Sequence, residues 1–243
     1  MRPSVVILCG GRGTRLQEHT QSIPKPMVEI GGRPILWHVI QIYLAQGFRR
    51  FLLLTGYRGE QVQRFVDEQT WPAETDVRCL QTGLDTPTGG RLHLAAAELS
   101  ELRGEGFCLT YADGLADIDL GALLDYHARH GATATMTVVR PELPFGVAEL
   151  NGDGTILGFT EKPRSEHWIN GGFFCFEPAV LELLEPRSVL EREPLERLAG
   201  ASGLRAFRHE GFWHCMDTYK DAVLLNDLWK SDGAEPAPWK LWS

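Results

Sequence analysis

Residues 4–16 read Ser-Val-Val-Ile-Leu-Cys-Gly-Gly-Arg-Gly-Thr-Arg-Leu, and this stretch decides the fold. Residues 5–9 form a continuous apolar run with β-branched side chains, which is typical of a buried strand in a parallel sheet. Gly10, Gly11 and Gly13 follow directly, and glycine permits positive φ angles and the close approach of another molecule to the backbone. The stretch therefore predicts a buried strand that ends in a glycine loop.

The charged residues around this loop suggest what it binds. Exposed amide groups in a glycine loop form a concave nest for phosphate oxygens. Arg12 and Arg15 add guanidinium groups, and Lys25, held between two prolines, adds an ammonium group on a stiffened segment. The alternative is a tight glycine turn with solvated arginines, but the combination favours a polyphosphate site. The Walker and dinucleotide-binding patterns are both absent, because Thr14 and Arg15 follow Gly13.

Composition narrows the possible classes of protein. The chain has 243 residues, enough for one α/β domain with a sizeable core. Its 24 basic and 32 acidic residues give a formal net charge of −8, which argues against general nucleic-acid or membrane-surface binding. No apolar run approaches the roughly 18–20 residues of a membrane span. The five cysteines have apolar neighbours and no C-x-x-C pairing, as expected of reduced thiols in a cytoplasmic protein.

Strand and helix patterns alternate through the first part of the chain. Strands are expected at 5–9, 51–55 and 77–80, with helices at 34–45 and 60–68 between them. This order predicts an α/β fold with a right-handed, doubly wound, mostly parallel (Rossmann-like) sheet. In such sheets, ligands bind beyond the carboxyl ends of the strands, which is where the glycine loop lies.

The second half of the chain has a different pattern. Further strands are expected at 107–110 and 132–138, and the alternation of threonine with apolar residues in the latter predicts one partly exposed face. From residue 141 onward, short strands alternate with turns. We expect these strands to be antiparallel additions to the sheet that form a lid over the other half of the site.

A second glycine-rich loop, residues 81–91, follows the strand at 77–80. It is either an irregular connection with a glycine at a helix start, or the wall against which a nucleobase packs. Its position beside the first loop favours the nucleobase wall, with threonine hydroxyls or backbone amides reading the edge of the base. We therefore expect nucleotide contacts at Leu8, Gly10, Gly11, Gly13, Thr14, Thr86, Thr88, Gly89 and Arg91.

Two carboxylates are candidate metal ligands. Asp113 follows the strand at 107–110 and precedes a glycine, a usual arrangement for holding Mg²⁺ against phosphates. Asp217 precedes the last expected helix, at 219–230. It is either the second carboxylate on the metal or the N-cap of that helix, and Thr218 could equally be the N-cap. Asp117 and Asp119 are expected to cap the helix that begins at residue 120.

The later part of the chain carries a second candidate site. In Glu161-Lys162-Pro163, the lysine can meet a second phosphate and the glutamate can accept hydrogen bonds from sugar hydroxyls. Ordinary surface composition is the alternative. Asn170 and Gly171 open the next strand and leave space for a ligand against the backbone. The tail from residue 234 contains two tryptophans, which suggest docking onto a neighbouring subunit or back onto the domain.

The glycine loop together with Pro24-Lys-Pro-Met resembles the signature of the sugar-1-phosphate nucleotidyltransferases, and most closely that of the glucose-1-phosphate cytidylyltransferases. Further stretches that match are Thr88-Gly-Gly-Arg-Leu, Thr110-Tyr-Ala-Asp-Gly, Glu161-Lys-Pro, Ile169-Asn-Gly-Gly-Phe-Phe and Gly211-Phe-Trp-His-Cys-Met-Asp-Thr. The chain departs from the pattern at two places. Ala112 replaces a glycine, which is a small change. The region between residues 57 and 81 is shorter, and the second loop begins with Gln81 instead of an aspartate, both beside the expected base pocket.

The resemblance implies roles for individual residues. Arg15 and Lys25 would stabilise the triphosphate, and Asp113 with Asp217 would hold Mg²⁺. Lys162 would bind the sugar phosphate, and Glu161 the sugar, beside Asn170 and Gly171. The implied substrates are a nucleoside triphosphate, with CTP favoured, and a sugar 1-phosphate. We expect one domain, 1–243, with a nucleotide-binding half at 1–140, a sugar-phosphate-binding half at 141–243, and assembly into a homo-oligomer.

Two alternatives remain beside this expectation. The enzyme could be a uridylyl-, thymidylyl- or guanylyltransferase that acts on another sugar 1-phosphate. A non-catalytic regulatory subunit with the same fold is the other alternative, and it would be expected to have lost a carboxylate or a site lysine. The candidate residues Arg15, Lys25, Asp113, Lys162 and Asp217 are all present, which favours the enzyme.

Overall fold

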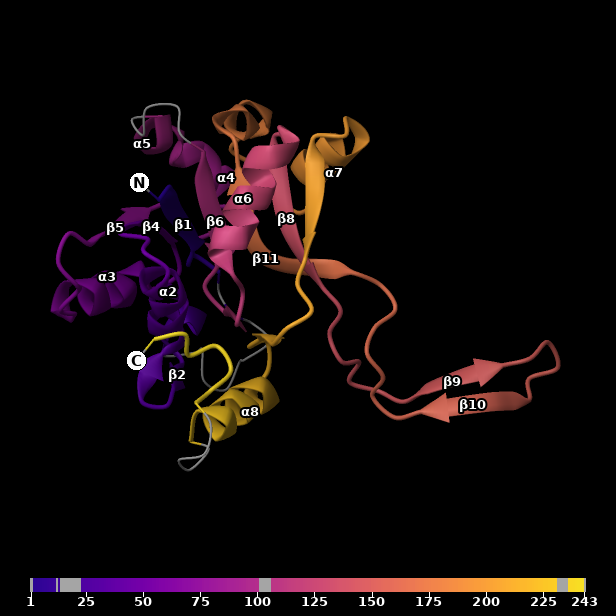
Figure 1. Ribbon diagram of the computed structural model, residues 1–243. Helices are drawn as coiled ribbons and strands as arrows, with labels where there is room; N and C mark the ends of the chain where they lie inside the picture. Colours follow the sequence, from indigo (N-terminus) through magenta and orange to yellow (C-terminus); the bar gives the residue numbers. More distant parts are fainter. Residues whose placement is uncertain (1, 12, 14–22, 101–105, 231–235, 243) are drawn as a thin grey trace.

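A seven-stranded sheet forms the centre of the computed structural model, which describes residues 2–11, 13, 23–100, 106–230 and 236–242 (Figure 1). The strand order is β12-β8-β11-β6-β1-β4-β5. The pairs that β11 makes with β6 and β8 are antiparallel, and the other pairs of this sheet are parallel. The strands are β1 (Ser4–Leu8), β4 (Arg50–Thr55), β5 (Asp76–Gln81), β6 (Phe107–Tyr111), β8 (Ala134–Val139), β11 (Ile169–Phe176) and β12 (Leu204–Arg208).

Helices cover both faces of the sheet. Successive strand residues point to opposite faces and therefore pack into two separate cores. Within β1, Val5 and Ile7 belong to one core, and Val6 and Leu8 belong to the other. The first core includes residues of α2 (Ile35–Ala45), α3 (Gly59–Glu68), α6 (Leu120–His130) and α8 (Tyr219–Lys230). The second includes residues of α4 (Thr88–Leu94), α5 (Ala96–Ser100), the 3₁₀ helix η3 (Pro178–Leu183) and α7 (Glu193–Gly200). The predicted doubly wound, mostly parallel α/β fold is confirmed.

Short antiparallel pairs complete the structure. The 3₁₀ helix η2 (Lys25–Met27) leads into the pair β2 (Glu29–Ile30) and β3 (Arg33–Pro34), and β7 (Gly114–Ala116) pairs with β13 (Trp213–Cys215). The third pair, β9 (Val147–Leu150) with β10 (Ile156–Thr160), projects from the body as a hairpin (Figure 1). Of the expected antiparallel additions, β11 joins the main sheet, whereas β9 and β10 form this separate arm instead of a lid.

The expectation of a partly exposed face on β8 is wrong. The side chains of Thr135 and Thr137 are fully buried, because α6 packs against this part of the sheet. Thr137 donates a hydrogen bond to the carbonyl oxygen of Phe173, at 2.8 Å. The Thr135 hydroxyl lies 2.8 Å from Nδ1 of His127. Hydrogen bonding of each hydroxyl inside the protein lets threonine occupy a buried strand, so alternation with threonine did not indicate exposure here.

The C-terminal segment packs back onto the domain. The side chain of Trp239 is fully buried and stacks against Trp229 of α8 and Phe212. Its indole Nε1 donates a hydrogen bond to Nδ1 of His38 on α2, at 3.3 Å. The tail therefore contributes to the core of its own chain, which was one of the two expected dockings. Among the described helices, none combines the length and apolar character needed to cross a membrane.

Candidate active site

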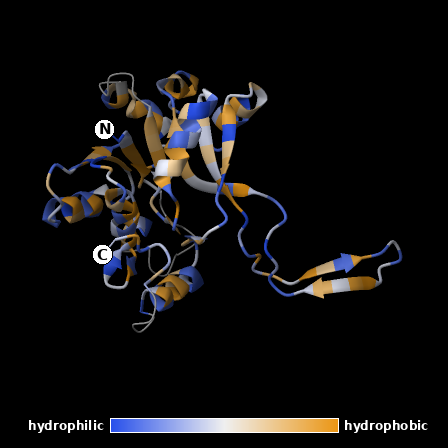
Figure 2. Cartoon of the chain, in the orientation of Figure 1, coloured by the Kyte–Doolittle hydropathy of each residue, from blue (hydrophilic) through white to orange (hydrophobic). Residues whose placement is uncertain are grey.

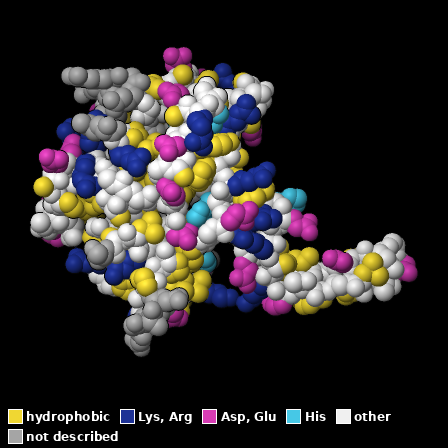
Figure 3. Space-filling model, viewed as in Figure 1, with side chains coloured by type: hydrophobic (Ala, Val, Ile, Leu, Met, Phe, Trp, Pro, Cys, Tyr) yellow, Lys and Arg dark blue, Asp and Glu magenta, His cyan; other side chains and the backbone are white. Residues whose placement is uncertain are grey.

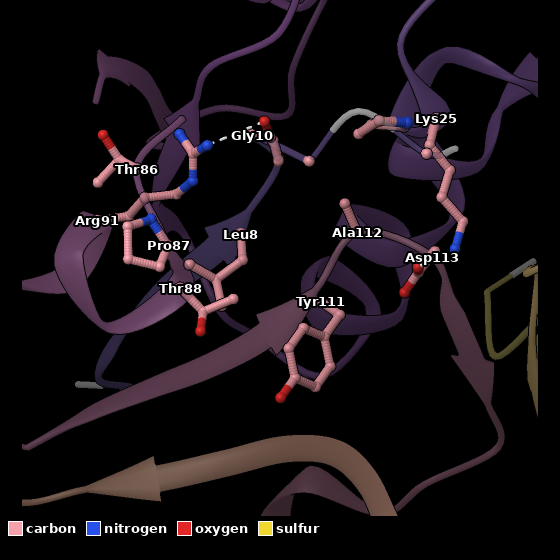
Figure 4. Close-up of a pocket in the computed structure, with 14 residues that line it drawn as sticks. Leu8, Gly10, Lys25, Thr86, Pro87, Thr88, Arg91, Tyr111, Ala112 and Asp113 are labelled. Carbon is pink, nitrogen blue, oxygen red and sulfur yellow. Dashed lines mark hydrogen bonds and ion pairs between the residues drawn. The ribbon is translucent and has the colours of Figure 1, made fainter. Parts of the chain in front are cut away.

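A pocket with a volume of about 250 Å³ opens beyond the carboxyl ends of β1 and β6 (Figure 4). This is the place where ligands bind in open α/β sheets. The expected residues that line it are Leu8, Gly10, Gly11, Gly13, Lys25, Thr86, Thr88, Arg91 and Asp113. They are joined there by Cys9, Pro26, Pro87, Tyr111 and Ala112. Thr14 and Arg15 lie outside the described residues.

Arg91 holds the walls of this pocket together. Its side chain is buried, and its guanidinium donates hydrogen bonds to the carbonyl oxygens of Gly10 (3.0 Å), Thr55 (3.0 Å) and Gly83 (2.9 Å). It also donates to the Thr82 hydroxyl, at 2.6 Å. A Cβ atom at Gly10 would overlap the guanidinium, so glycine is needed at that position for packing. Arg91 lines the pocket as expected. Its Nη atoms are hydrogen-bonded to the protein itself, and they join the first glycine loop, at Gly10, to the second, at Thr82 and Gly83.

Lys25 lies between the two candidate metal ligands. Its Nζ atom is 2.6 Å from Oδ2 of Asp113 and 2.7 Å from Oδ1 of Asp217. The β7–β13 pair brings these distant segments together, and Met216 N donates to the carbonyl oxygen of Asp113, at 2.9 Å. Burial acts to lower the pKa of Lys25, but hydrogen bonds to the two carboxylates and the charge of Asp113 outweigh it and raise the pKa. The ammonium group therefore stays charged.

The same carboxylates fit a divalent cation. Ligand atoms of Asp113, Cys215 and Asp217 all lie within 4.8 Å of one another. Two converging carboxylates already share one cation, the Lys25 ammonium, and hard divalent ions such as Mg²⁺ prefer oxygen ligands of this kind. Burial raises the pKa of the Cys215 thiol, which favours the protonated form that binds metal poorly. Asp113 and Asp217 are therefore the residues suited to hold the ion.

Hydrogen bonds at the start of α8 identify Thr218, and not Asp217, as the N-cap of this helix. The Thr218 hydroxyl accepts a hydrogen bond from the Asp221 amide (3.3 Å), and the Asp221 carboxylate accepts one from the Thr218 amide (2.7 Å). This reciprocal pair is a capping box, with Thr218 as the N-cap. Asp119 caps α6 as expected, whereas Asp117 lies beside His209. The Asp217 carboxylate faces Lys25 instead of capping the helix.

Gly89 has a packing role rather than a place in the pocket lining. A Cβ atom there would lie 2.8 Å from the Ser188 carbonyl oxygen, so the glycine lets residues 186–190 pack closely on α4. That packing brings in Glu191, which the sequence did not indicate as a site residue. Its carboxylate accepts hydrogen bonds from the Thr88 hydroxyl (2.6 Å) and the Tyr111 hydroxyl (2.7 Å). Unlike Glu191, Tyr111 had a local signal, because it belongs to the motif that contains Asp113.

The structure divides the expected sugar-site residues into two groups. Asn170 reaches the edge of the pocket, where its Nδ2 donates to the Tyr111 hydroxyl at 3.2 Å, and Gly171 follows it on β11. Glu161 and Lys162 are exposed, directly after β10 at the base of the hairpin, and are not among the residues that line the pocket. The structure therefore does not bring Lys162 together with Lys25 and Asp113.

The structure is thus an α/β protein with a pocket of about 250 Å³, a glycine loop that lines this pocket and a carboxylate–lysine cluster at its edge. A sequence model described as Nucleotidyl transferase matches residues 4–208. A probable glucose-1-phosphate cytidylyltransferase of Bacillus subtilis (strain 168) is 40% identical over 98% of this chain and 99% of its own length. The glucose-1-phosphate cytidylyltransferase of Salmonella typhimurium is also 40% identical, with 98% of both chains covered.

More distant similarity extends to other members. Mannose-1-phosphate guanylyltransferase 1 of Arabidopsis thaliana is 31% identical, over 98% of this chain and 68% of its own length. The crystal structure of HddC from Yersinia pseudotuberculosis complexed with GMP-PN has a TM-score of 0.74 at 21% identity, covering 94% of this chain and 100% of that chain. This last likeness supports the fold. The chain belongs to the nucleotidyl transferase family, and it is an enzyme that transfers a nucleoside monophosphate to a sugar 1-phosphate.

Proposed function

We propose that this enzyme transfers CMP from CTP to glucose 1-phosphate and releases pyrophosphate. The observation that carries the proposal is the 40% identity to cytidylyltransferases over 98% of the chain, in a protein that places Lys25 between Asp113 and Asp217. We further propose that it acts in the cytoplasm, as a homo-oligomer, with Mg²⁺. Residues 1–140 would bind the nucleotide, and residues 141–243 the sugar phosphate.

The reaction joins two anions, so its main requirements are alignment and neutralisation of charge. An oxygen of the sugar phosphate attacks the α-phosphorus in line, forming a new P–O bond while the bond to the β-phosphate oxygen breaks. The sugar phosphate is already ionised near neutral pH, and no general base is needed. When bound by Asp113 and Asp217, Mg²⁺ would supply positive charge beside the phosphates.

The residues of the chain divide this work. Backbone amides of Gly10, Gly11 and Gly13 bind the phosphate oxygens, while Arg15 and the Lys25 ammonium neutralise charge on the triphosphate. Lys162, which lies outside the pocket lining in this structure, would bind the acceptor phosphate, and Glu161 would accept hydrogen bonds from the sugar, together with Asn170 and Gly171. Support for placing the sugar on this side comes from Asn170, which contacts Tyr111 at the pocket edge.

One experiment tests both substrates. Pyrophosphate release would be measured with CTP, UTP, dTTP, GTP and ATP, each against glucose 1-phosphate and mannose 1-phosphate, with products identified by mass. We expect CTP with glucose 1-phosphate to give the highest kcat/KM. A second candidate, GTP with mannose 1-phosphate, is favoured by the Arabidopsis thaliana relative. Nucleotide binding without pyrophosphate release from any pair would instead indicate a regulatory subunit.

A further inference from the structure

The three hydroxyl-bearing side chains that line the described pocket all donate their protons to other parts of the protein. Thr86 donates to the carbonyl oxygen of Thr82, at 2.5 Å. Thr88 and Tyr111 donate to the two oxygens of the Glu191 carboxylate, at 2.6 and 2.7 Å. A carbonyl or ionised carboxylate oxygen can only accept, so the direction of each hydrogen bond is fixed.

The hydroxyls that Glu191 binds can therefore offer a ligand only lone pairs. Thr88 already accepts one hydrogen bond, from the Leu190 amide at 2.9 Å, and Tyr111 accepts one from Asn170 Nδ2 at 3.2 Å. The guanidinium Nη atoms of Arg91, on the same wall, donate to five oxygens of neighbouring segments of the chain. Figure 4 shows the hydroxyls of Thr88 and Tyr111 directed toward the same side of the pocket. Because their protons are already used within the protein, the side-chain hydroxyls of this wall can accept hydrogen bonds from a ligand but cannot donate to it.

We propose that Glu191 is a positioning residue that fixes this polarity and so favours a nucleobase with an amino group over one with a carbonyl oxygen at the same place. Cytosine carries an amino donor where uracil and thymine carry an acceptor. Hydroxyls that can only accept would form a hydrogen bond with the amino group of cytosine. The carbonyl oxygen of uracil or thymine would instead face their lone pairs and would form no hydrogen bond with them. The inference rests on the proposed function and identifies what selects the base.

The position of Glu191 indicates that its carboxylate orients the hydroxyls of Thr88 and Tyr111 and contributes little to the stability of the fold. The residue is exposed and belongs to neither core, so its side chain contributes little to burial. It nevertheless has a defined place, because the Gly90 amide donates to the carbonyl oxygen of Ser188, at 3.0 Å, and fixes the segment on α4. One carboxylate thus joins α4, which begins at Thr88, to the end of β6 at Tyr111.

Glu191→Gln tests the proposal, because the amide keeps the shape but adds donors. One of the two hydroxyls would then accept from the amide and could turn its proton toward the ligand. Glu193→Gln is the matched control: this glutamate is also exposed, and its carboxylate lies 3.9 Å from Arg197, away from the pocket. Dissociation constants for CTP and UTP would be measured by calorimetry without sugar phosphate, with melting temperatures recorded for all three proteins.

We expect the wild type to bind CTP more tightly than UTP, and Glu191→Gln to reduce this ratio about tenfold at unchanged melting temperature. Glu193→Gln should keep the wild-type ratio. An unchanged ratio in Glu191→Gln, or a wild type that prefers UTP, would overturn the proposal while leaving nucleotidyl transfer intact. Preferential CTP binding that responds to Glu191→Gln without pyrophosphate release would overturn the proposed function instead. Tyr111→Phe gives a second test, because loss of one acceptor should weaken CTP binding more than UTP binding.

Discussion

At the scale of single residues, Lys25 contributes a positive charge at the end of the pocket in which we propose that the nucleotide binds. Its ammonium is held by two carboxylates and is only 14% exposed, so it is placed before any substrate arrives. We expect Lys25→Ala to lower kcat by about 10²–10³, by analogy with the loss of one oxyanion donor, while KM for the nucleotide changes little. Steady-state kinetics with varied CTP measures both parameters. An effect on KM alone would make Lys25 a ground-state binding residue.

Asp217 and Thr218 are adjacent, but substitution of Asp217 should affect mainly kcat, and substitution of Thr218 mainly the free energy of unfolding. Asp217→Asn removes a candidate ligand of the divalent ion and should reduce kcat severely, as should Asp113→Asn, with the melting temperature preserved. Thr218→Ala removes the N-cap of α8 and should cost about 1 kcal/mol in the free energy of unfolding, with kcat retained. Activity and denaturant unfolding would be compared across the three variants. Full activity of Asp217→Asn at saturating Mg²⁺ would exclude a metal-binding role.

At the scale of elements, α8 and the tail support the segment that carries Lys25. Asn226 of α8 accepts a hydrogen bond from the Gly31 amide, at 2.9 Å, and His38 Nε2 lies 2.8 Å from the carbonyl oxygen of Ile30. Trp239 closes this cluster from the tail. The β2–β3 pair, which directly follows η2, is therefore fixed by the C-terminal part of the chain.

The buried imidazole of His38 makes this support sensitive to pH. Burial lowers its pKa to about 4, whereas an unfolded histidine has a pKa of about 6.5. Between these values the unfolded chain binds the extra proton, so stability should fall as the pH decreases from about 6.5 to 4, by about 3 kcal/mol in total. Urea unfolding of the wild type and His38→Gln across this range isolates the contribution. Parallel pH dependences of the two proteins would contradict it.

The sequence predicted correctly those elements whose burial follows from the pattern of apolar residues within the element itself. The strand β1 and the helix α2 have continuous or periodic apolar positions, so their burial could be predicted. β8 was interpreted wrongly because its threonine hydroxyls find partners on other elements. Convergence of Asp113 and Asp217 was proposed from strand-end loops, whereas the placement of Lys25 between them depends on the β7–β13 pairing. Glu191 had no local signal, because its partners are Thr88 and Tyr111, far away along the chain.

At the scale of the whole molecule, the β9–β10 hairpin projects from the body, and its apolar side chains remain exposed. Apolar residues of the arm appear as orange ribbon in Figure 2 and yellow surface in Figure 3. Leu150, Ile156, Leu157 and Phe159 are each between 61% and 66% exposed. A two-stranded sheet on its own is at best marginally stable in water, and contiguous apolar patches on a soluble protein mark interaction sites.

We therefore expect this hairpin to pack against another copy of the chain in the homo-oligomer proposed above. Charged residues in place of Leu157 and Phe159 would make its burial costly, since an unpaired charge loses its hydration at an apolar interface. The double variant Leu157→Lys/Phe159→Lys should have a lower molar mass by light scattering than the wild type, with an unchanged circular dichroism spectrum. Leu94→Lys is the control, because Leu94 is 51% exposed on α4 and lies outside the hairpin. A wild type that is already monomeric, or a double variant that keeps the wild-type mass, would show that the apolar arm is not the contact between subunits.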